Sequence, residues 1–532
     1  VHYVGTPPYN VLSILTSRAS EEIRFQRLDD PTGMAVYDEI VIGDRVVEFR
    51  AGEENLRKEL HSHFPSEADR KAVDDYLRLV HEASDHTGFY ACKLIRPLFL
   101  RRIIQWFYRK VLNPSLHRHQ TNTTWQTLSK HLNGASPELL NVLCARFGQT
   151  GPSPFADTFA SHASVVNHFL DGGYYPVGGS AEFVDKISPT ILASGGAIKV
   201  RKHVERIIVD TQTDQVEGVE LDDGKCISAP VVLSGAGIRN TYKYLLRPAD
   251  LNETTRQSIA PLEKMEEDIG VSVKFAFCFF DLNGTSEELG LNSRNVWDLP
   301  LPSADANLQD FLQSFLQSGC TMQTCTMGVG EKKSEEGYDG QGRNAGVQRR
   351  MPIFISSLSA KDPSYNERFP GKSAAVVITY SRTEDFDKWS DMNHRARRKS
   401  STYNSVKEYY REILTEHLHR HFPQTRGRVL HSEVATPLTT KSFLNAPDGE
   451  FRGLDENVAK ASYHAHFEPE TPVRGLYLCG QELTMLGVFS ALQAGVLAAS
   501  AVLEYGTMFD LIFRRSLIGD LRRLLQDGKK EQ

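Results

Sequence analysis

The sequence predicts an α/β fold with a large insertion, because runs with the periodicity of strands alternate with long helical segments. β-branched runs on either side of a Gly43-Asp44 turn predict a hairpin over residues 35–50. Residues 53–170 then have apolar residues spaced by three and four, as helices do, and strand-like runs return near residue 197. This alternation excludes an all-helical and an all-β protein.

The individual elements follow from the same patterns and from the turn residues. Ser66 and Asp69 form a capping start for a helix through Val80. Helical spacing returns at 402–421 and 487–503, and the polar stretch from Gly328 to Arg350 predicts a mobile surface loop. The strand-like runs that follow the helical insertion are 197–200, 204–210, 215–221, 229–234, 351–357, 374–380 and 475–479.

Composition narrows the class of protein. The 532 residues include 61 Lys and Arg against 67 Asp and Glu, and the net charge of −6 predicts no nucleic-acid partner. The 40% hydrophobic and 24% charged residues are typical of a soluble globular protein. Seven cysteines without a Cys-x-x-Cys pair predict neither a metal site nor a disulfide framework.

Two stretches have the apolar content of membrane elements. Thr484 to Leu503 carries no charge, but its many small residues favour a buried helix over a spanning one. Leu94 to Leu112 contains five cations, so it predicts either a basic amphipathic helix at a membrane surface or a helix that covers the core. The tail from Met508 to Leu525 has a similar basic amphipathic pattern. We therefore expect membrane contact to be peripheral.

The C-terminal unit carries the strongest chemical signal. A buried strand ends at Gly480, Glu482 stands two residues on, and a helix begins at Gly487-Val488. This arrangement suits a flavin, because the Glu482 carboxylate can accept from ribityl hydroxyls and the helix start presents unpaired N–H groups. The small residues Ala491, Gly495 and Ala499 predict a helix face that approaches a sheet closely. Taken locally, an ordinary βα unit is the alternative.

Two further units have weaker signals. Pro176 to Gly179 is a Pro-x-Gly-Gly turn that leads into a helix through Leu192, and such a turn alone is usually structural. The strand from Met351 ends in a hydroxyl-rich loop that bears Lys361 and Asp362. On local pattern alone, a solvated Lys–Asp pair at a strand end is favoured for these two residues.

Two motifs are discounted as sites. His417, His419 and His421 lack the glutamate of the zinc-protease helix, so they predict a solvated helix face and no metal site. Gly235-Ala236-Gly237 is half of a phosphate loop, but Asn240 stands where the third glycine belongs. It is interpreted as a turn at a strand end.

Taken in chain order, these units resemble the retinol saturase branch of the carotenoid isomerase and phytoene desaturase superfamily of flavoproteins. The resemblance covers about residues 1–505. The residues that carry it are His2-Tyr3-Val4-Gly5, the turn Tyr175 to Gly179, the strand at Val204 with Gly218-Val219, the run Phe354 to Pro363, Thr436 to Thr439, and Gly475 to Ala491.

The resemblance implies a discontinuous Rossmann-type FAD-binding domain and an inserted α+β substrate domain for a hydrophobic polyene. It implies FAD contacts at Val204, Gly480, Glu482, Gly487 and Val488, and makes Lys361 and Asp362 candidates for the substrate pocket. Family members often have Asp at the position of Glu482. The implied division is 1–60, the remainder of an N-terminal FAD segment; 61–170, a helical substrate-domain insertion; 171–247, an FAD return segment; 248–435, the substrate domain; 436–505, the C-terminal FAD segment; and 506–532, an amphipathic tail.

The family also has Gly-x-Gly-x-x-Gly after its first strand, which this sequence lacks. The dinucleotide-binding domain is therefore expected to be N-terminally incomplete, and residues 1–532 alone are expected to be free of flavin and prone to aggregation.

The implied activity is FAD-dependent saturation of a C=C bond in a retinol-like or carotenoid-like isoprenoid, with NAD(P)H as a possible electron donor. Carotenoid cis–trans isomerisation or desaturation is the alternative within the same superfamily. A non-catalytic polyene-binding protein is the alternative of another class. The resemblance further implies association with the endoplasmic reticulum membrane, or with the plastid in a photosynthetic organism.

Overall fold

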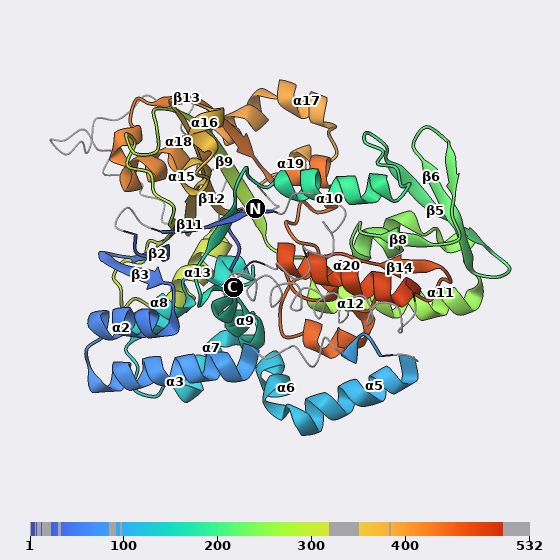
Figure 1. The fold of residues 1–532 in the computed structure, drawn as a ribbon, viewed down its shortest axis with the longest axis horizontal. Coiled ribbons are helices and arrows are strands. Elements are labelled where there is room, and N and C mark those ends of the chain that lie inside the picture. Colours follow the sequence, from blue (N-terminus) through green and yellow to red (C-terminus); the bar gives the residue numbers. More distant parts are fainter. Residues whose placement is uncertain are drawn as a thin grey trace, which may run out of the picture.

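In the computed structural model, the described residues are 2–5, 7, 12, 23–29, 33–84, 92–95, 98–318, 351–381 and 385–503. The predicted loop at 328–350 and the predicted tail at 506–532 lie outside them. Figure 1 shows three regions around the central helix α20: a large sheet with its own helices, a helical region below it, and a smaller β region on the opposite side.

The largest sheet has seven strands in the order β13-β9-β12-β11-β10-β2-β3. All neighbours pair antiparallel except β10 and β2, which pair parallel. The strands are β2 (Val36–Ile42), β3 (Arg45–Arg50), β9 (Lys274–Asn283), β10 (Asn295–Leu299), β11 (Ile353–Ser357), β12 (Lys372–Ser381) and β13 (Val429–Ala435).

The hairpin expected at 35–50 is confirmed by the antiparallel pairing of β2 and β3. The family resemblance implies that these residues belong to the FAD segment 1–60. Their hydrogen bonds instead place them in the same sheet as strands from 248–435.

The helical insertion forms the layer below β2 and β3. Its helices are α2 (Glu53–His63), α3 (Glu67–Ser84), α5 (Leu98–Phe107), α6 (Pro114–Thr121), α7 (Thr124–His131), α8 (Pro137–Cys144) and α9 (Phe159–Phe169), with the π-helical turn η1 (Tyr108–Leu112) after α5. The predicted cap is confirmed, because the Ser66 hydroxyl accepts the N–H of Asp69 at 3.0 Å. The buried faces of α3 and α9 share one apolar core with β2 and β3.

The smaller β region contains two sheets. Strands β5 (Val204–Asp210), β6 (Gln215–Leu221) and β7 (Cys226–Ser228) form an antiparallel sheet, and β8 (Val232–Ser234) pairs parallel with β14 (Leu476–Leu478). A third pair joins β1 (Phe25–Arg27) to β4 (Tyr174–Pro176). The strand predicted at 197–200 is wrong: these residues are irregular, and Ile198 and Val200 stand exposed without a strand partner among the described residues.

The other helices surround these sheets. They are α10 (Glu182–Ala193), α11 (Glu253–Ile259), α12 (Pro261–Ile269), α13 (Leu308–Ser318), α15 (Leu358–Lys361), α16 (Tyr365–Arg368), α17 (His394–Lys399), α18 (Ser401–His421), α19 (Pro437–Leu444) and α20 (Val488–Leu503). No helix in the described ranges has the length and apolar content needed to cross a bilayer.

The expected packing face of α20 is wrong. Ala491 and Gly495 are exposed, whereas Ala494 is buried in a cluster that includes Leu478 of β14. The helix has small residues on both faces, and the face that also carries Leu497 is buried because it removes more apolar surface from water.

Candidate active site

A cavity of about 1490 Å³ lies between the large sheet and the start of α20. One wall comes from strands β9, β10, β11 and β12, and the opposite wall comes from residues 481–497. Residues of α9, including Val165, His168 and Phe169, close the space between the two walls. The cavity therefore joins segments that are separated by hundreds of residues in the sequence.

The sheet wall is aromatic. Phe275 and Phe277 of β9, Trp297 of β10, Phe354 of β11 and Tyr380 of β12 all line the cavity. The rings pack on one another, with centroids 4.6 Å apart for Trp297 and Phe354 and 4.9 Å apart for Phe275 and Tyr380. Alternate residues of a strand share a face, so the spacing of Phe275 and Phe277 in the sequence was the signal for this wall.

The opposite wall is the predicted C-terminal unit. Gly487 and Val488 line the cavity, and so do Phe489 and Ser490 in the first turn of α20. Gly487 has a φ of +103°, and a Cβ built on it would meet no heavy atom within 4 Å. Its N–H donates to the side-chain oxygen of Gln481 at 2.9 Å. The backbone at this point is therefore open toward the cavity.

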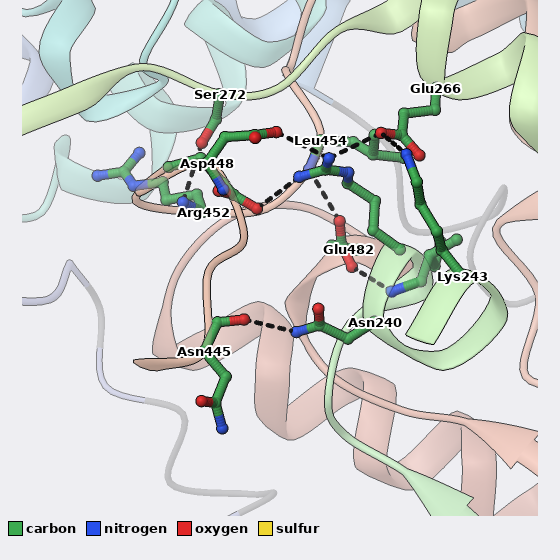
Figure 2. A network of polar contacts seen from close by, with 12 residues as sticks. Asn240, Lys243, Glu266, Ser272, Asn445, Asp448, Arg452, Leu454 and Glu482 are labelled. Carbon is green, nitrogen blue, oxygen red and sulfur yellow. Dashed lines mark hydrogen bonds and ion pairs between the residues drawn. The ribbon is translucent and has the colours of Figure 1, made fainter. Parts of the chain in front are cut away.

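Glu482 lies behind this wall. One carboxylate oxygen accepts the N–H of Ile238 at 2.8 Å and the other accepts the N–H of Leu454 at 2.9 Å. Figure 2 shows the Glu482 side chain between Leu454 and the turn that leads to Asn240. The carboxylate thus joins three segments of the chain. Neither Glu482 nor Gly480 is among the described residues that line the cavity, although Gln481 and Thr484 are.

Val204, the remaining predicted cofactor contact, and the histidines of α18 that were discounted as a metal site lie elsewhere. Val204 begins β5 in the antiparallel sheet and is not among the described lining residues. His421 contacts Asp298 at 2.9 Å and His417 contacts it at 3.8 Å. The expectation of a solvated helix face is therefore wrong for these two histidines, which point toward β10 because a buried carboxylate needs partners. Asp298 is buried, which alone would raise its pKa, but His417, His421 and Arg420 hold that pKa well below its usual range.

Lys361 and Asp362 are not a solvated pair, contrary to their local pattern. The buried Lys361 ammonium donates to the His2 carbonyl at 3.0 Å, to the Ser356 hydroxyl at 2.6 Å and to the Asn295 side chain. Burial lowers the pKa of Lys361 to about 7. His2 lines the cavity and Lys361 stands one layer behind it.

Asp362 connects two of the sequence motifs. Its carboxylate accepts the N–H of Gly178, in the Pro-x-Gly-Gly turn, at 3.2 Å. It also accepts from the N–H and hydroxyl of Ser364 and pairs with Arg368. Asp362 is therefore a link between loops and is not among the described lining residues.

Sequence reasoning missed a buried ionic network beside the cavity. The Asp38 carboxylate accepts from Tyr3, Arg146 and Asn295, each at 2.9 Å. Tyr3 itself lines the cavity. No local pattern marks Asp38 and Arg146, because they meet only when α8 and the following turn pack on β2.

Three titratable groups that line the cavity, His168, Tyr3 and Tyr380, are held in their neutral forms by burial. Burial lowers the pKa of His168 to about 4, and its Nε2 atom accepts the N–H of Gly5 at 3.0 Å. Burial also raises the pKa values of Tyr3 and Tyr380 well above the usual value of a phenol. Both hydroxyls therefore carry their protons at neutral pH.

The residues present fit a flavin ring. A pocket for a single small ligand has about 300–1,000 Å³, so a cavity of about 1490 Å³ is large enough for a ring system together with a second apolar molecule. The N-terminus of a helix favours electron-rich groups, and the first turn of α20 faces this space. The open backbone at Gly487 allows a flat ring edge to approach.

No family model matches the chain. An all-trans-retinol 13,14-reductase of Danio rerio is 29% identical over 526 residues, which are 95% of this chain and 77% of that protein. A Danio rerio protein named inactive all-trans-retinol 13,14-reductase is 26% identical, over 87% of this chain and 70% of its own length. A neurosporene-forming phytoene desaturase of Rhodobacter capsulatus is 23% identical, over 62% of this chain and 54% of its own length.

Two solved structures share the fold. Putrescine oxidase bound to putrescine has a TM-score of 0.53 at 10% identity, and the match covers 94% of this chain and 88% of that one. Cyclohexylamine oxidase from Brevibacterium oxydans has a TM-score of 0.51 at 12% identity, covering 94% and 86%. The predicted α/β class is confirmed. With the sequence matches, the chain is a homologue of the all-trans-retinol 13,14-reductases and, more distantly, of the phytoene desaturases.

Proposed function

We propose that this protein is an FAD-dependent oxidoreductase that saturates a C=C bond of a hydrophobic conjugated isoprenoid of the all-trans-retinol type. The observation that carries the proposal is the cavity, whose aromatic sheet wall faces the open backbone at Gly487. The homology to all-trans-retinol 13,14-reductases supports the same substrate class.

The chain's own residues orient and enclose the substrate. The rings of Phe277, Trp297 and Phe354 offer flat apolar surface to a planar polyene and exclude water from it. When bound, FAD supplies hydride chemistry at its N5 position. Reduction of a double bond also needs a proton on the second carbon, and we assign its source to the hydroxyls of Tyr3 and Tyr380, which line the cavity and carry their protons at neutral pH.

We assign the flavin to the C-terminal wall. Gly487 and Val488 provide the backbone that the ring approaches, and Glu482 with Gly480 shapes the segment behind them. Each Glu482 oxygen accepts one N–H in the structure and has a second lone pair for a ribityl hydroxyl. Val204 as a further contact, and NAD(P)H as the electron donor, are part of the same proposal.

Two other functions have specific support. The phytoene desaturase relatives favour desaturation, the reaction in the opposite direction, and isomerisation of the same kind of bond is the alternative that the sequence resemblance implies. The relative named inactive favours a polyene-binding protein without turnover. The cavity accommodates a polyene in all three cases.

Product mass separates these functions. FAD-loaded full-length protein is incubated with a panel of polyenes that includes all-trans-retinol, in one arm with a reductant and in a second arm with an electron acceptor, and the products are analysed by mass spectrometry. Saturation adds two hydrogens, desaturation removes two, and isomerisation leaves the mass unchanged. A bound but unaltered polyene across the whole panel would favour the binding protein and contradict our proposal.

We further propose that the protein works at a membrane, where its apolar substrate dissolves. By resemblance this is the endoplasmic reticulum, or the plastid in a photosynthetic organism. The location is tested by imaging the full-length protein in its own cells beside markers of both compartments.

A further inference from the structure

Helix α5 and the turn η1 have an inverted distribution of polarity. Their outward side chains are large and apolar: Phe99 is 67% exposed, Ile103 58%, Trp106 61% and Leu112 64%. Amphipathic surface helices of soluble proteins bury their apolar stripe and expose their charges. Figure 1 shows α5, in blue at the lower right, at the periphery of the molecule.

The inner face of the same segment is polar. Arg101 is 1% exposed, and its guanidinium pairs with Glu468 and Glu470 at 2.9 Å. Gln105, one turn later, donates to Glu468 at 3.1 Å. Arg109, one turn further, contacts His464 at 2.7 Å.

These buried polar contacts fix which way the helix faces. An Arg101 that rotated outward would leave the buried Glu468 and the partly buried Glu470 without their guanidinium partner, which is strongly unfavourable. The helix therefore keeps Phe99, Ile103 and Trp106 toward the outside even though water disfavours them. A set of large apolar side chains on one exposed face marks an interaction site.

We propose that the outer face of α5 and η1, defined by Phe99, Ile103, Trp106 and Leu112, inserts into the surface of an anionic lipid bilayer. The segment 98–112 contains no Asp or Glu, and its Arg102 and Lys110 are exposed beside the apolar side chains. Such a face complements anionic headgroups above a hydrocarbon layer. A ten-residue helix rises about 15 Å, half of the bilayer core, so it lies in the interface and does not cross.

The segment before α5 connects this face to the cavity. Leu94 lines the cavity, and the Lys93 ammonium donates to the carbonyl of Leu483, next to Glu482, at 2.7 Å. Leu94 lies four residues before the start of α5 in the sequence, and we place the entry of a lipid-soluble molecule on this side of the cavity. This second step rests on the proposed function, whereas bilayer insertion does not.

Vesicle flotation tests the insertion. Protein without substrate is mixed with vesicles of phosphatidylcholine, or of phosphatidylcholine with phosphatidylserine, and the floating fraction is measured. The double variant Ile103→Glu/Trp106→Glu should bind anionic vesicles at least tenfold more weakly than the wild type. A matched control, Leu430→Glu/Phe443→Glu, changes two side chains that are equally exposed, 55% and 65%, on β13 and α19, and should bind as the wild type does.

The fluorescence of Trp106 measures how deeply this side chain enters the bilayer. Lipids brominated in their acyl chains should quench part of the wild-type tryptophan fluorescence, and Trp106→Phe should remove that quenching while vesicle binding persists. Arg102→Gln/Lys110→Gln should lose the preference for anionic vesicles. Equal flotation of the wild type and the Ile103→Glu/Trp106→Glu variant would overturn the proposal. The proposal would also be overturned if the wild type is dimeric by light scattering and does not float while the Ile103→Glu/Trp106→Glu variant is monomeric. That result would show that a second copy covers the face.

These readouts are independent of turnover. The Ile103→Glu/Trp106→Glu variant should retain activity toward a polyene dispersed in detergent and lose it toward the same polyene in vesicles. Absence of turnover in detergent for wild type and variant alike would count against the proposed function and would leave the flotation result standing.

Discussion

At the residue scale, the buried groups beside the cavity have protonation states that can be measured. Lys361 is enclosed by three oxygen acceptors, and burial lowers its pKa to about 7 although Asp38 opposes the shift. In the unfolded chain a lysine has a pKa of about 10.4. Between these two values the unfolded state binds a proton that the folded state does not.

The free energy of unfolding should therefore rise with pH across this window, because stability increases wherever the unfolded state binds more protons. Lys361→Met should remove this slope, so that the difference between wild type and variant grows between about pH 7 and about pH 10. Urea unfolding at several pH values measures it. Lys264→Met, at an exposed position of α12, is the control. Parallel pH profiles for wild type and Lys361→Met would mean that Lys361 titrates normally.

Glu482 and Gly487 should control flavin retention. Glu482→Ala removes the acceptor of two backbone N–H groups, and Gly487→Val places a branched side chain in open space at a φ of +103°. We expect each to lower FAD affinity by about 1.5–3 kcal/mol, roughly 10- to 100-fold. Fluorescence of released flavin in the purified full-length protein measures this loss.

Each of these two variants has a control that makes the same kind of change, loss of a carboxylate or strain at a glycine, away from the cavity wall. Glu205→Ala removes an exposed carboxylate from β5. Gly371→Val imposes the same kind of backbone strain, since Gly371 has a φ of +67° and open space around it, but it lies before β12 and away from the cavity wall. Undiminished flavin in Glu482→Ala and Gly487→Val would refute the assignment of the C-terminal wall.

At the scale of elements, Asp362 joins the end of α15 to the turn before α10. Asp362→Asn should weaken this link, because an amide presents only one acceptor where the carboxylate accepts from Gly178, Ser364 and Arg368. Buried charge-assisted hydrogen bonds contribute about 1.5–3 kcal/mol each. Chemical denaturation should show a loss of that order, whereas the exposed Asp391→Asn should show none. An Asp362→Asn protein as stable as the wild type would show that the loops are held by other contacts.

At this scale the sequence predicted some elements correctly and others wrongly. Elements with strong local signals were predicted well: the hairpin around Gly43, the helix capped by Ser66 and the strand before Gly480 are all present. The predicted strand at 197–200 failed because β-branched composition does not form a strand without a neighbour to pair with. The packing face of α20 was misjudged because small residues occur on two of its faces, and only tertiary packing decides between them.

At the scale of the whole molecule, the cavity depends on contacts that no local pattern reveals. Gly487 was predicted from a motif and does line the cavity, but Tyr3, Trp297 and Tyr380 reach it from separate parts of the chain. The family resemblance makes Lys361 a candidate for the substrate pocket, whereas the structure places it one layer behind the wall. The fold class can be predicted from the periodicity of apolar residues alone. The residues that line a cavity can be predicted only when the topology of the sheet is known.

The central claim is that this cavity brings a flavin against a polyene so that the two exchange a hydride. Single-turnover spectroscopy tests it most directly: FAD-loaded full-length protein is reduced under anaerobic conditions, one equivalent of all-trans-retinol is added, and flavin absorbance is followed. The account predicts that oxidised flavin returns in step with a product two hydrogens heavier. A flavin that stays reduced while retinol is bound, whether retinol is isomerised or unchanged, would contradict it.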